Sequence, residues 1–178
     1  LVNGSATVVS QTFSGSGAEY HLSFTDISVD GTIEVTVPAG VAVDGAQNGN
    51  LASATFTVVF DTMAPAAPVI ISPEDGDTRN TALPVISGTA EPSNDPAGDT
   101  ITVEVFSSVH GSLGTAETDA DGAWSLTPSQ AMSEGAHMLT AVATDAAVNA
   151  GPLSGELIVH IHLDPFAGLL QSDRACHV

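Results

Sequence analysis

Asp and Asn side chains, whose oxygen atoms can act as metal ligands, recur in two loops of the sequence, at residues 44–50 and 145–149. Calcium takes about six to eight oxygen ligands, which come from carboxylates, side-chain amides and backbone carbonyls. A calcium ion bound at a junction between domains would stiffen that junction. The predicted ligands are Asp44, Asn48, Asn50, Asp61, Asp75, Asp145 and Asn149, with Glu74 and Asp77 as further candidates. In the alternative interpretation, these residues only make hydrogen bonds within their own turns.

Three histidines and one tryptophan offer other binding chemistry. His160 and His162 point to the same side of a predicted strand, and together with His137 from another strand they could bind zinc. The alternative is that all three are exposed histidines near the end of a sheet. Trp124 could stack against a sugar ring, but a single tryptophan in an alternating strand is more often part of the core.

Enzyme signatures are missing from the sequence. It contains no Gly-x-Ser-x-Gly segment, phosphate-binding loop, His-Glu-x-x-His segment or cysteine pair. Acidic residues are numerous enough for a glycosidase-like pair of carboxylates. Aromatic residues make up only 4% of the chain, however, so a sugar-binding cleft would have few rings to line it. We therefore predict that the chain is not an enzyme.

The charge of the chain argues against one class of partner. It has 21 acidic and 2 basic residues, which gives a net charge of -19. Such a surface repels the phosphates of nucleic acids and of anionic lipids, so we expect no nucleic-acid partner. No apolar run approaches the roughly 20 residues needed to span a membrane, so we expect no membrane insertion by this segment. The single cysteine, Cys176, leaves no internal disulfide.

Short alternating segments predict an all-β chain. Apolar residues recur at every second position in runs such as 19–25, 32–37 and 100–106, and β-branched residues are frequent throughout. We expect four strands before residue 62 and seven between residues 69 and 163, with at most one helical turn at residues 128–133. Strands of this length and spacing are typical of a β-sandwich.

Proline divides the predicted strands into two domains. Pro65 and Pro68 mark residues 63–68 as a short linker, because proline favours extended backbone and cannot enter a central strand. We expect residues 69–163 to form a complete domain and residues 164–178 to form an irregular tail. A sandwich usually needs about seven strands. Residues 1–62 are therefore expected to be the C-terminal part of a domain whose first strands precede Leu1, and the chain to be a fragment of a longer polypeptide.

The two predicted domains share one order of features, which suggests a tandem array. Asp30-Gly31 and Glu134-Gly135 each precede a strand that leads to a loop with Asp and Asn, then to another strand and a closing acid. These features resemble bacterial immunoglobulin-like (Ig-like) domains, the tandem modules of large surface adhesins and other exported proteins. The segments that carry the resemblance are Ala67-Pro68-Val69-Ile70, Ser72-Pro73-Glu74-Asp75-Gly76, Ile86-Ser87-Gly88-Thr89-Ala90-Glu91-Pro92, Asp121-Gly122-Ala123-Trp124-Ser125, Glu134-Gly135-Ala136-His137 and Ala143-Thr144-Asp145-Ala146-Ala147-Val148-Asn149.

The resemblance implies a fold and a role. It implies tandem Ig-like β-sandwiches, the first truncated at its N-terminus, in a non-catalytic structural or adhesive module at the cell surface. Some members bind calcium at domain junctions. In the family a glycine usually precedes the Asn of the Asp loop, whereas Gln47 and Val148 stand there in this chain.

The implied partners are neighbouring Ig-like repeats in the same chain, and ligands on host or neighbouring cells that other domains would reach. The alternative function is a carbohydrate-binding accessory domain of a secreted enzyme. An exposed aromatic cluster near Trp124 would favour that alternative, whereas a buried Trp124 would favour the spacer.

Overall fold

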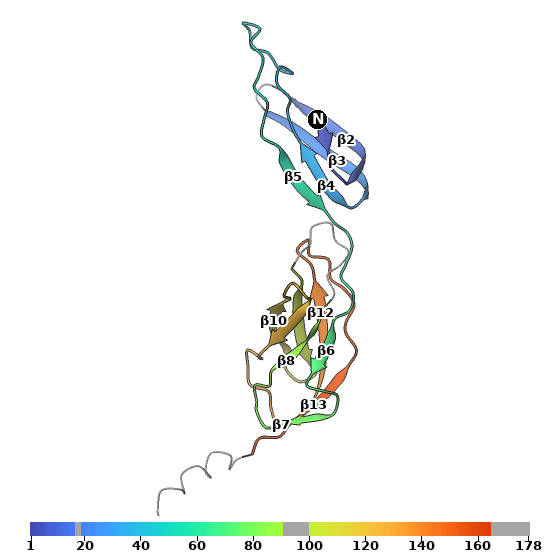
Figure 1. Ribbon diagram of the computed structural model, residues 1–178, viewed down its shortest axis with the longest axis vertical. Helices are drawn as coiled ribbons and strands as arrows, with labels where there is room; N and C mark the ends of the chain where they lie inside the picture. Colours follow the sequence, from blue (N-terminus) through green and yellow to red (C-terminus); the bar gives the residue numbers. More distant parts are fainter. Residues whose placement is uncertain (17–18, 91–99, 165–178) are drawn as a thin grey trace, which may run out of the picture. The chain divides into compact units, whose positions relative to one another are not determined.

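The computed structural model describes residues 1–16, 19–90 and 100–164, which form strands, turns and loops (Figure 1). The chain divides into two compact units, a first unit of Leu1–Met63 and a second unit that begins at Ala64. In the described part of the chain, no helix is long and apolar enough to cross a membrane. The all-β class predicted from the sequence is confirmed.

The second unit is a sandwich of a five-stranded sheet, in the order β10-β9-β12-β13-β7, and a three-stranded sheet, in the order β11-β8-β6. All neighbouring strands are antiparallel except β13 and β7, which are parallel. The strands are β6 (Val69–Ser72), β7 (Asp77–Arg79), β8 (Ile86–Thr89), β9 (Thr102–Ser107), β10 (Gly111–Glu117), β11 (Ala123–Leu126), β12 (Gly135–Thr144) and β13 (Leu157–Ile161).

Alternation along the strands builds the core of this sandwich. In β12, Leu139, Ala141 and Ala143 are buried while the residues between them are partly or fully exposed. Strands β9 and β13 alternate in the same way, because successive side chains of a strand point to opposite faces of a sheet. Ile86 and Trp124 close the core from the smaller sheet, and Trp124 is only 3% exposed. The core is therefore mainly aliphatic, as the composition predicts.

Strand β7 lies where the sequence predicts an acidic turn. It pairs in parallel with β13, with Asp77 opposite Val159 and Arg79 opposite Ile161. The strand is short and mostly polar, so it carries no apolar alternation and the prediction missed it. Residues 128–133 form no helical turn.

The first unit has sheets but little core. It contains a three-stranded sheet in the order β1-β4-β5 and a separate hairpin of β2 and β3. Among its described residues, Ile33 is the one large apolar side chain that is fully buried, while Phe13, Tyr20 and Phe56 are exposed. A strand of two residues, β1, was not predicted. The strands are β1 (Val2–Asn3), β2 (Thr7–Ser16), β3 (Glu19–Val29), β4 (Gly31–Val35) and β5 (Phe56–Phe60).

Candidate functional site

The loop after β12 is closed by hydrogen bonds between Asp145 and Asn149. Asp145 Oδ1 accepts a hydrogen bond from the Asn149 backbone N–H at 2.8 Å, and Asp145 Oδ2 accepts one from Asn149 Nδ2 at 3.0 Å. The Val148 N–H donates to the Asp145 carbonyl at 3.2 Å, and Val148 has a φ of 69°. This left-handed backbone is strained for a β-branched residue. The buried Asp145 carboxylate thus holds a turn that the sequence at Val148 does not favour.

The loop at residues 44–48 of the first unit has the same hydrogen bonds. Asp44 Oδ1 accepts hydrogen bonds from the Asn48 and Ala46 N–H groups at 2.9 and 2.8 Å, and Oδ2 accepts one from Asn48 Nδ2 at 3.0 Å. Gln47, in the position of Val148, has a φ of 67°. Both residues therefore adopt the left-handed backbone that glycine adopts without strain.

The similarity extends beyond the loops to the hairpins that carry them. Gly31 in β4 pairs with Phe60 in β5, as Gly135 in β12 pairs with Ile161 in β13.

A serine after each loop also makes the same three hydrogen bonds. The Ser53 hydroxyl accepts from the Val37 N–H at 2.9 Å and donates to the Ala54 carbonyl at 2.8 Å, and the Ser53 N–H donates to the Val37 carbonyl at 2.9 Å. Ser154 does the same with Ala141 and Gly155. The loop, the serine and the hairpin register of the first unit thus repeat those at the end of the second unit.

The other predicted calcium ligands also make hydrogen bonds within the protein. Asn50 Oδ1 accepts from the Ala42 N–H at 2.9 Å, and Asn50 Nδ2 donates to two backbone carbonyls. Asp61 Oδ1 accepts from the Met63 N–H at 2.9 Å. Asp75 Oδ1 accepts from the Ile158 N–H at 2.8 Å, which joins two segments far apart in the sequence.

In the two Asp–Asn loops, the predicted calcium ligands make hydrogen bonds to one another. The carboxylate oxygens of Asp44 and Asp145 face N–H donors of their own loops, and Asn48 and Asn149 turn their NH₂ groups toward those oxygens. A calcium site needs oxygens, not N–H groups, directed at the ion. The described residues contain no group of three or more His, Cys, Asp or Glu side chains that could hold a metal ion.

The three histidines do not converge. His137 is buried in β12, which corrects the interpretation of all three as exposed. His160 lies on the exposed side of β13, between the core residues Val159 and Ile161. His162 Nδ1 lies 3.1 Å from Glu134 Oε1.

His137 instead contacts a serine inside the core. The two atoms Ser107 Oγ and His137 Nδ1 are 2.9 Å apart, which is the spacing of a hydroxyl nucleophile and its base. Both residues are buried, so a substrate could not reach the hydroxyl.

The family of the chain follows from its second unit. The sequence profile of the bacterial Ig-like domain family matches residues 71–161, just over half of the chain. The chain belongs to this family. Bacterial Ig-like domains are typical of exported and surface proteins, and they typically act as non-catalytic structural modules.

One solved structure is also similar to the chain that carries this bacterial Ig-like domain. A solved structure described as fibronectin(III)-like modules of Clostridium thermocellum CbhA is similar to the chain, with 14% identity and a TM-score of 0.45. The similarity covers 92% of this chain and 76% of that chain. None of the curated proteins matches the chain.

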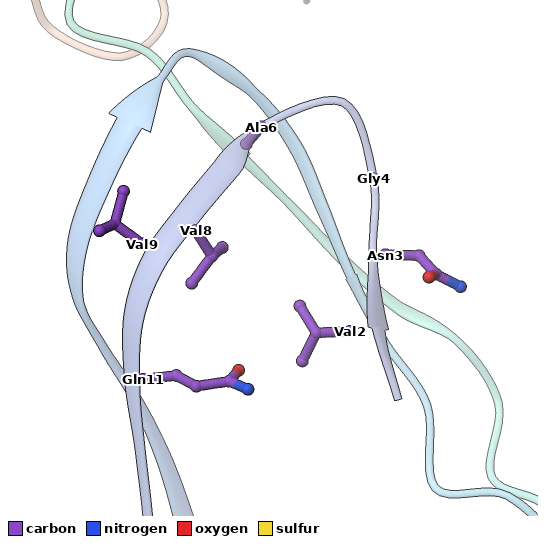
Figure 2. Close-up of a pocket in the computed structure, with 7 residues that line it drawn as sticks. All are labelled: Val2, Asn3, Gly4, Ala6, Val8, Val9 and Gln11. Carbon is purple, nitrogen blue, oxygen red and sulfur yellow. The ribbon is translucent and has the colours of Figure 1, made fainter.

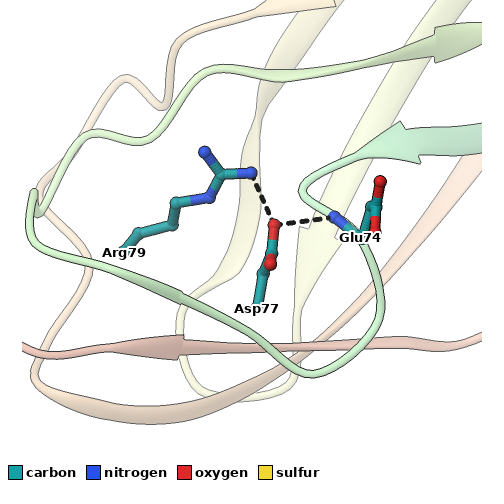
Figure 3. A network of polar contacts seen from close by, with 3 residues as sticks. All are labelled: Glu74, Asp77 and Arg79. Carbon is teal, nitrogen blue, oxygen red and sulfur yellow. Dashed lines mark hydrogen bonds and ion pairs between the residues drawn. The ribbon is translucent and has the colours of Figure 1, made fainter.

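One feature of the bacterial Ig-like domain that sequence reasoning missed is the network around Asp77. Asp77 Oδ2 accepts hydrogen bonds from Arg79 at 2.7 Å and from the Glu74 N–H at 3.1 Å (Figure 3). These bonds fix the turn that leads into β7. The only available signal was Arg79, the one basic residue among 1–173, beside three acids.

Acid should loosen the loop at residues 44–48. The Asn48 side-chain amide, followed by the backbone N–H groups of Asn48 and Ala46, holds the pKa of Asp44 below its ordinary value of 3.8. Because the folded pKa is the lower one, these bonds contribute fully above pH 3.8 and are lost as the pH falls through the folded pKa. An NMR titration should show the Asn48 amide signals shifting with a midpoint below 3.8. In Asp44→Asn this titration should disappear. A midpoint at or above 3.8 would contradict the assignment.

Proposed function

We propose that the chain is a non-catalytic spacer module of an exported bacterial surface protein, in which Ig-like units follow one another in tandem. The observation that supports this proposal best is the parallel pairing of β7 with β13. It joins the first part of the sandwich to its last strand. Neighbouring Ig-like repeats are the direct partners of such a module. Other domains of the parent protein bind ligands on host or neighbouring cells.

The β7–β13 ladder gives the spacer its resistance to stretching. The chain enters β7 at Asp77 and leaves β13 at Ile161. In a parallel pair these two ends lie at opposite ends of the ladder, so tension along the chain shears its hydrogen bonds together. Three bonds lengthen the ladder: Gly76 N–H to Ile158 O and His162 N–H to Arg79 O, both 2.8 Å, and Ile158 N–H to Asp75 Oδ1, also 2.8 Å. Bonds that load together resist more force than bonds that open one by one.

The start of the second unit is packed rather than loose. Pro65 is fully buried and Pro68 is buried, although both lie in the segment predicted as a linker. A Cβ on Gly151 would lie 2.3 Å from the Pro65 carbonyl oxygen, which shows how closely the backbone at Pro65 approaches the loop after β12. A proline-containing segment held in this way has few conformations. It therefore suits a spacer that must keep its reach.

The burial of Trp124 favours the spacer over carbohydrate binding. With 3% of its surface exposed, the indole ring cannot stack against a sugar. It lies between Gly88 and the core instead. Calcium has no part in the proposed mechanism, since the loop carboxylates already accept hydrogen bonds.

Single-molecule pulling on the full chain tests the spacer proposal. The second unit should unfold in one event that releases a contour length of about 300 Å. Asp75→Ala removes the hydrogen bond to Ile158, worth about 1 kcal/mol, and should lower the unfolding force. Asp121→Ala is the matched control, because Asp121 lies in the turn before β11, outside the ladder.

Three outcomes would contradict the proposal or part of it. Gradual extension without a force peak would remove the spacer function. Equal forces for the Asp75→Ala and Asp121→Ala variants would remove the role of the ladder. The unfolding force should be the same in calcium and in chelator, and a clear difference would restore calcium as a stiffening ion.

A further inference from the structure

The loop at residues 44–48 is followed by a residue that distinguishes it from its counterpart in the second unit. Asn48 precedes Gly49, whereas Asn149 precedes Ala150. Asparagine is a labile residue, because the backbone nitrogen of the next residue can attack its side-chain amide carbon. Glycine hinders this attack least, since it has no Cβ and a permissive backbone. The two loops share their hydrogen bonds and differ at the position that controls the reaction.

The nitrogen that would attack takes no part in the backbone ladder of the loop. Val43 and Gly49 face each other in an antiparallel bridge. Two backbone hydrogen bonds, of 3.0 and 2.9 Å, close this bridge, and both are made by the residues on either side of the facing pair. In such a pair the N–H groups of the facing residues point away from the partner strand. The Gly49 nitrogen is therefore not held by the ladder, and Asn48 and Gly49 are both exposed.

Asp44 restrains the other reacting group. Its carboxylate accepts hydrogen bonds from the Asn48 backbone N–H at 2.9 Å and from Asn48 Nδ2 at 3.0 Å. Attack requires the side-chain amide to rotate until its carbon meets the Gly49 nitrogen, and these two bonds remove that freedom. Asp44 is exposed, so water competes for its hydrogen bonds and the loop opens locally. The carboxylate therefore determines how often the Asn48 amide can react.

The chain has a second Asn-Gly pair, Asn3-Gly4, in a different setting. Asn3 belongs to β1, which pairs with β4, and a Cβ on Gly4 would lie 2.0 Å from the Thr32 carbonyl oxygen. Figure 2 shows Asn3 and Val2 on opposite sides of β1, as in a regular strand. Ring closure at Asn3 would require the first sheet to open, so we expect Asn48 to react first.

We propose that Asn48 is a self-modification site, which loses its side-chain amide at a rate that Asp44 controls. The Gly49 nitrogen gives up its proton and forms a bond to Asn48 Cγ. The bond from Cγ to Nδ2 breaks, and Nδ2 leaves as ammonia with the added proton. Water then opens the cyclic imide at either carbonyl, which leaves aspartate or isoaspartate at position 48. The reaction needs only water, because no atom is oxidised or reduced.

The product opens the loop at two points. A carboxylate oxygen replaces the Nδ2 donor, so two negative charges face each other where the 3.0 Å hydrogen bond to Asp44 stood. In isoaspartate the backbone also runs through the former side chain and gains one methylene group. This displaces the carbonyl that accepts from the Asp44 N–H. The first loop therefore opens as the protein ages, while the loop at residues 145–149 stays closed.

Incubation of the full chain in mildly alkaline buffer tests the site, with peptide mapping by mass spectrometry to locate each lost amide. Asn48 should lose its amide, and Asn149 in the same molecules should keep it. Asp44→Ala should speed the loss at Asn48 by about tenfold, because a few surface hydrogen bonds no longer hold the loop closed. Asp26→Ala is the matched control, since it removes an exposed carboxylate of the same unit from β3 and should leave the rate unchanged.

The loop of the second unit allows the opposite test. Ala150→Gly creates an Asn-Gly pair there and removes only a methyl group from an exposed residue. Asn149 should then lose its amide, but more slowly than Asn48, because the carboxylate of Asp145 that holds Asn149 is buried.

The reciprocal variant, Gly49→Ala, should protect Asn48. Its new Cβ would lie 3.0 Å from the Gly40 Cα, so unchanged NMR signals of the loop must first show that the variant is folded. If they change, Asp44→Ala and Ala150→Gly decide the question without it.

Three results would overturn the proposal. Asn48 could keep its amide in the folded chain over a time in which the chain unfolded in urea loses it. Asp44→Ala could react no faster than Asp26→Ala. Ala150→Gly could leave the rate at Asn149 unchanged. None of these results affects the pulling experiment, because the spacer proposal depends on the ladder of the second unit.

Discussion

Replacing Gly88 by alanine is expected to destabilise the second unit by about 3 kcal/mol, near the upper end of what overpacking a core costs. A Cβ at Gly88 would lie 1.8 Å from the Val69 carbonyl oxygen and 2.8 Å from Cζ2 of Trp124. The first contact is with backbone in the neighbouring strand β6, where Ile70 pairs with Gly88. Neither the strand nor the buried indole ring can move aside without opening the core. The lack of a side chain at Gly88 therefore allows β6 and the Trp124 ring to pack closely against β8.

Urea denaturation followed by Trp124 fluorescence would measure this loss, because the indole lies in the affected core. Gly155→Ala is the matched control. A Cβ at Gly155 meets nothing within 4 Å, so this variant should differ from the unaltered chain by no more than about 0.5 kcal/mol. Equal midpoints for Gly88→Ala and Gly155→Ala would show that β6 and Trp124 are not packed as described.

The long alternating strands of the second unit could be predicted from the sequence. Strand β13 alternates between buried and exposed residues and β9 between buried and half-buried ones, and the sequence shows the same period. Strand β7 could not be predicted, since three residues of the type Asp-Thr-Arg carry no apolar period. It forms because β13 offers an edge and because Asp77 and Asp75 fix its approach. Tertiary context determines such a strand.

The candidate site was less predictable for a chemical reason. Asp and Asn close together in a loop are suitable both for binding calcium and for accepting N–H groups within a turn. Composition cannot separate the two uses. The hydrogen bonds of Asp145 with Asn149 favour the turn, and they also explain why Val148 tolerates a left-handed backbone. The domain boundaries and calcium binding itself stay predictions that solution experiments must test.

In the first unit, the burial of the strand faces could not be predicted from the sequence pattern. Its alternation predicts buried faces, yet Phe56 and Val58 are exposed. The register of the β4–β5 hairpin matches that of the β12–β13 hairpin, in which the corresponding residues are buried. The alternation of apolar and polar residues therefore indicates which face of a strand is apolar, but not whether that face is buried. Whether that face is covered depends on strands that the described part of the first unit does not contain.

His137 gives the second large prediction. Its Nε2 lies 2.8 Å from the Ser133 carbonyl oxygen, and because a carbonyl oxygen only accepts, Nε2 carries a proton. In the neutral ring Nδ1 then accepts from the Ser107 hydroxyl at 2.9 Å. The ring also stacks on His110 at 5.4 Å, and His110 Nε2 accepts from the Ser133 N–H at 3.0 Å. One buried side chain thus anchors the segment before β12 to β9.

His137→Ala should destabilise the second unit by about 4 kcal/mol, because it leaves a cavity in the core and removes the hydrogen bonds of the ring to Ser107 and Ser133. His160→Ala, one strand away on the exposed side of β13, should change stability by no more than about 0.5 kcal/mol. Thermal unfolding of the two variants would measure the difference. Since His137 is in the core, the loss should appear whatever the calcium concentration. Equal stabilities would mean that Ser107 and Ser133 find other partners, and that the segment before β12 is held by the aliphatic core alone.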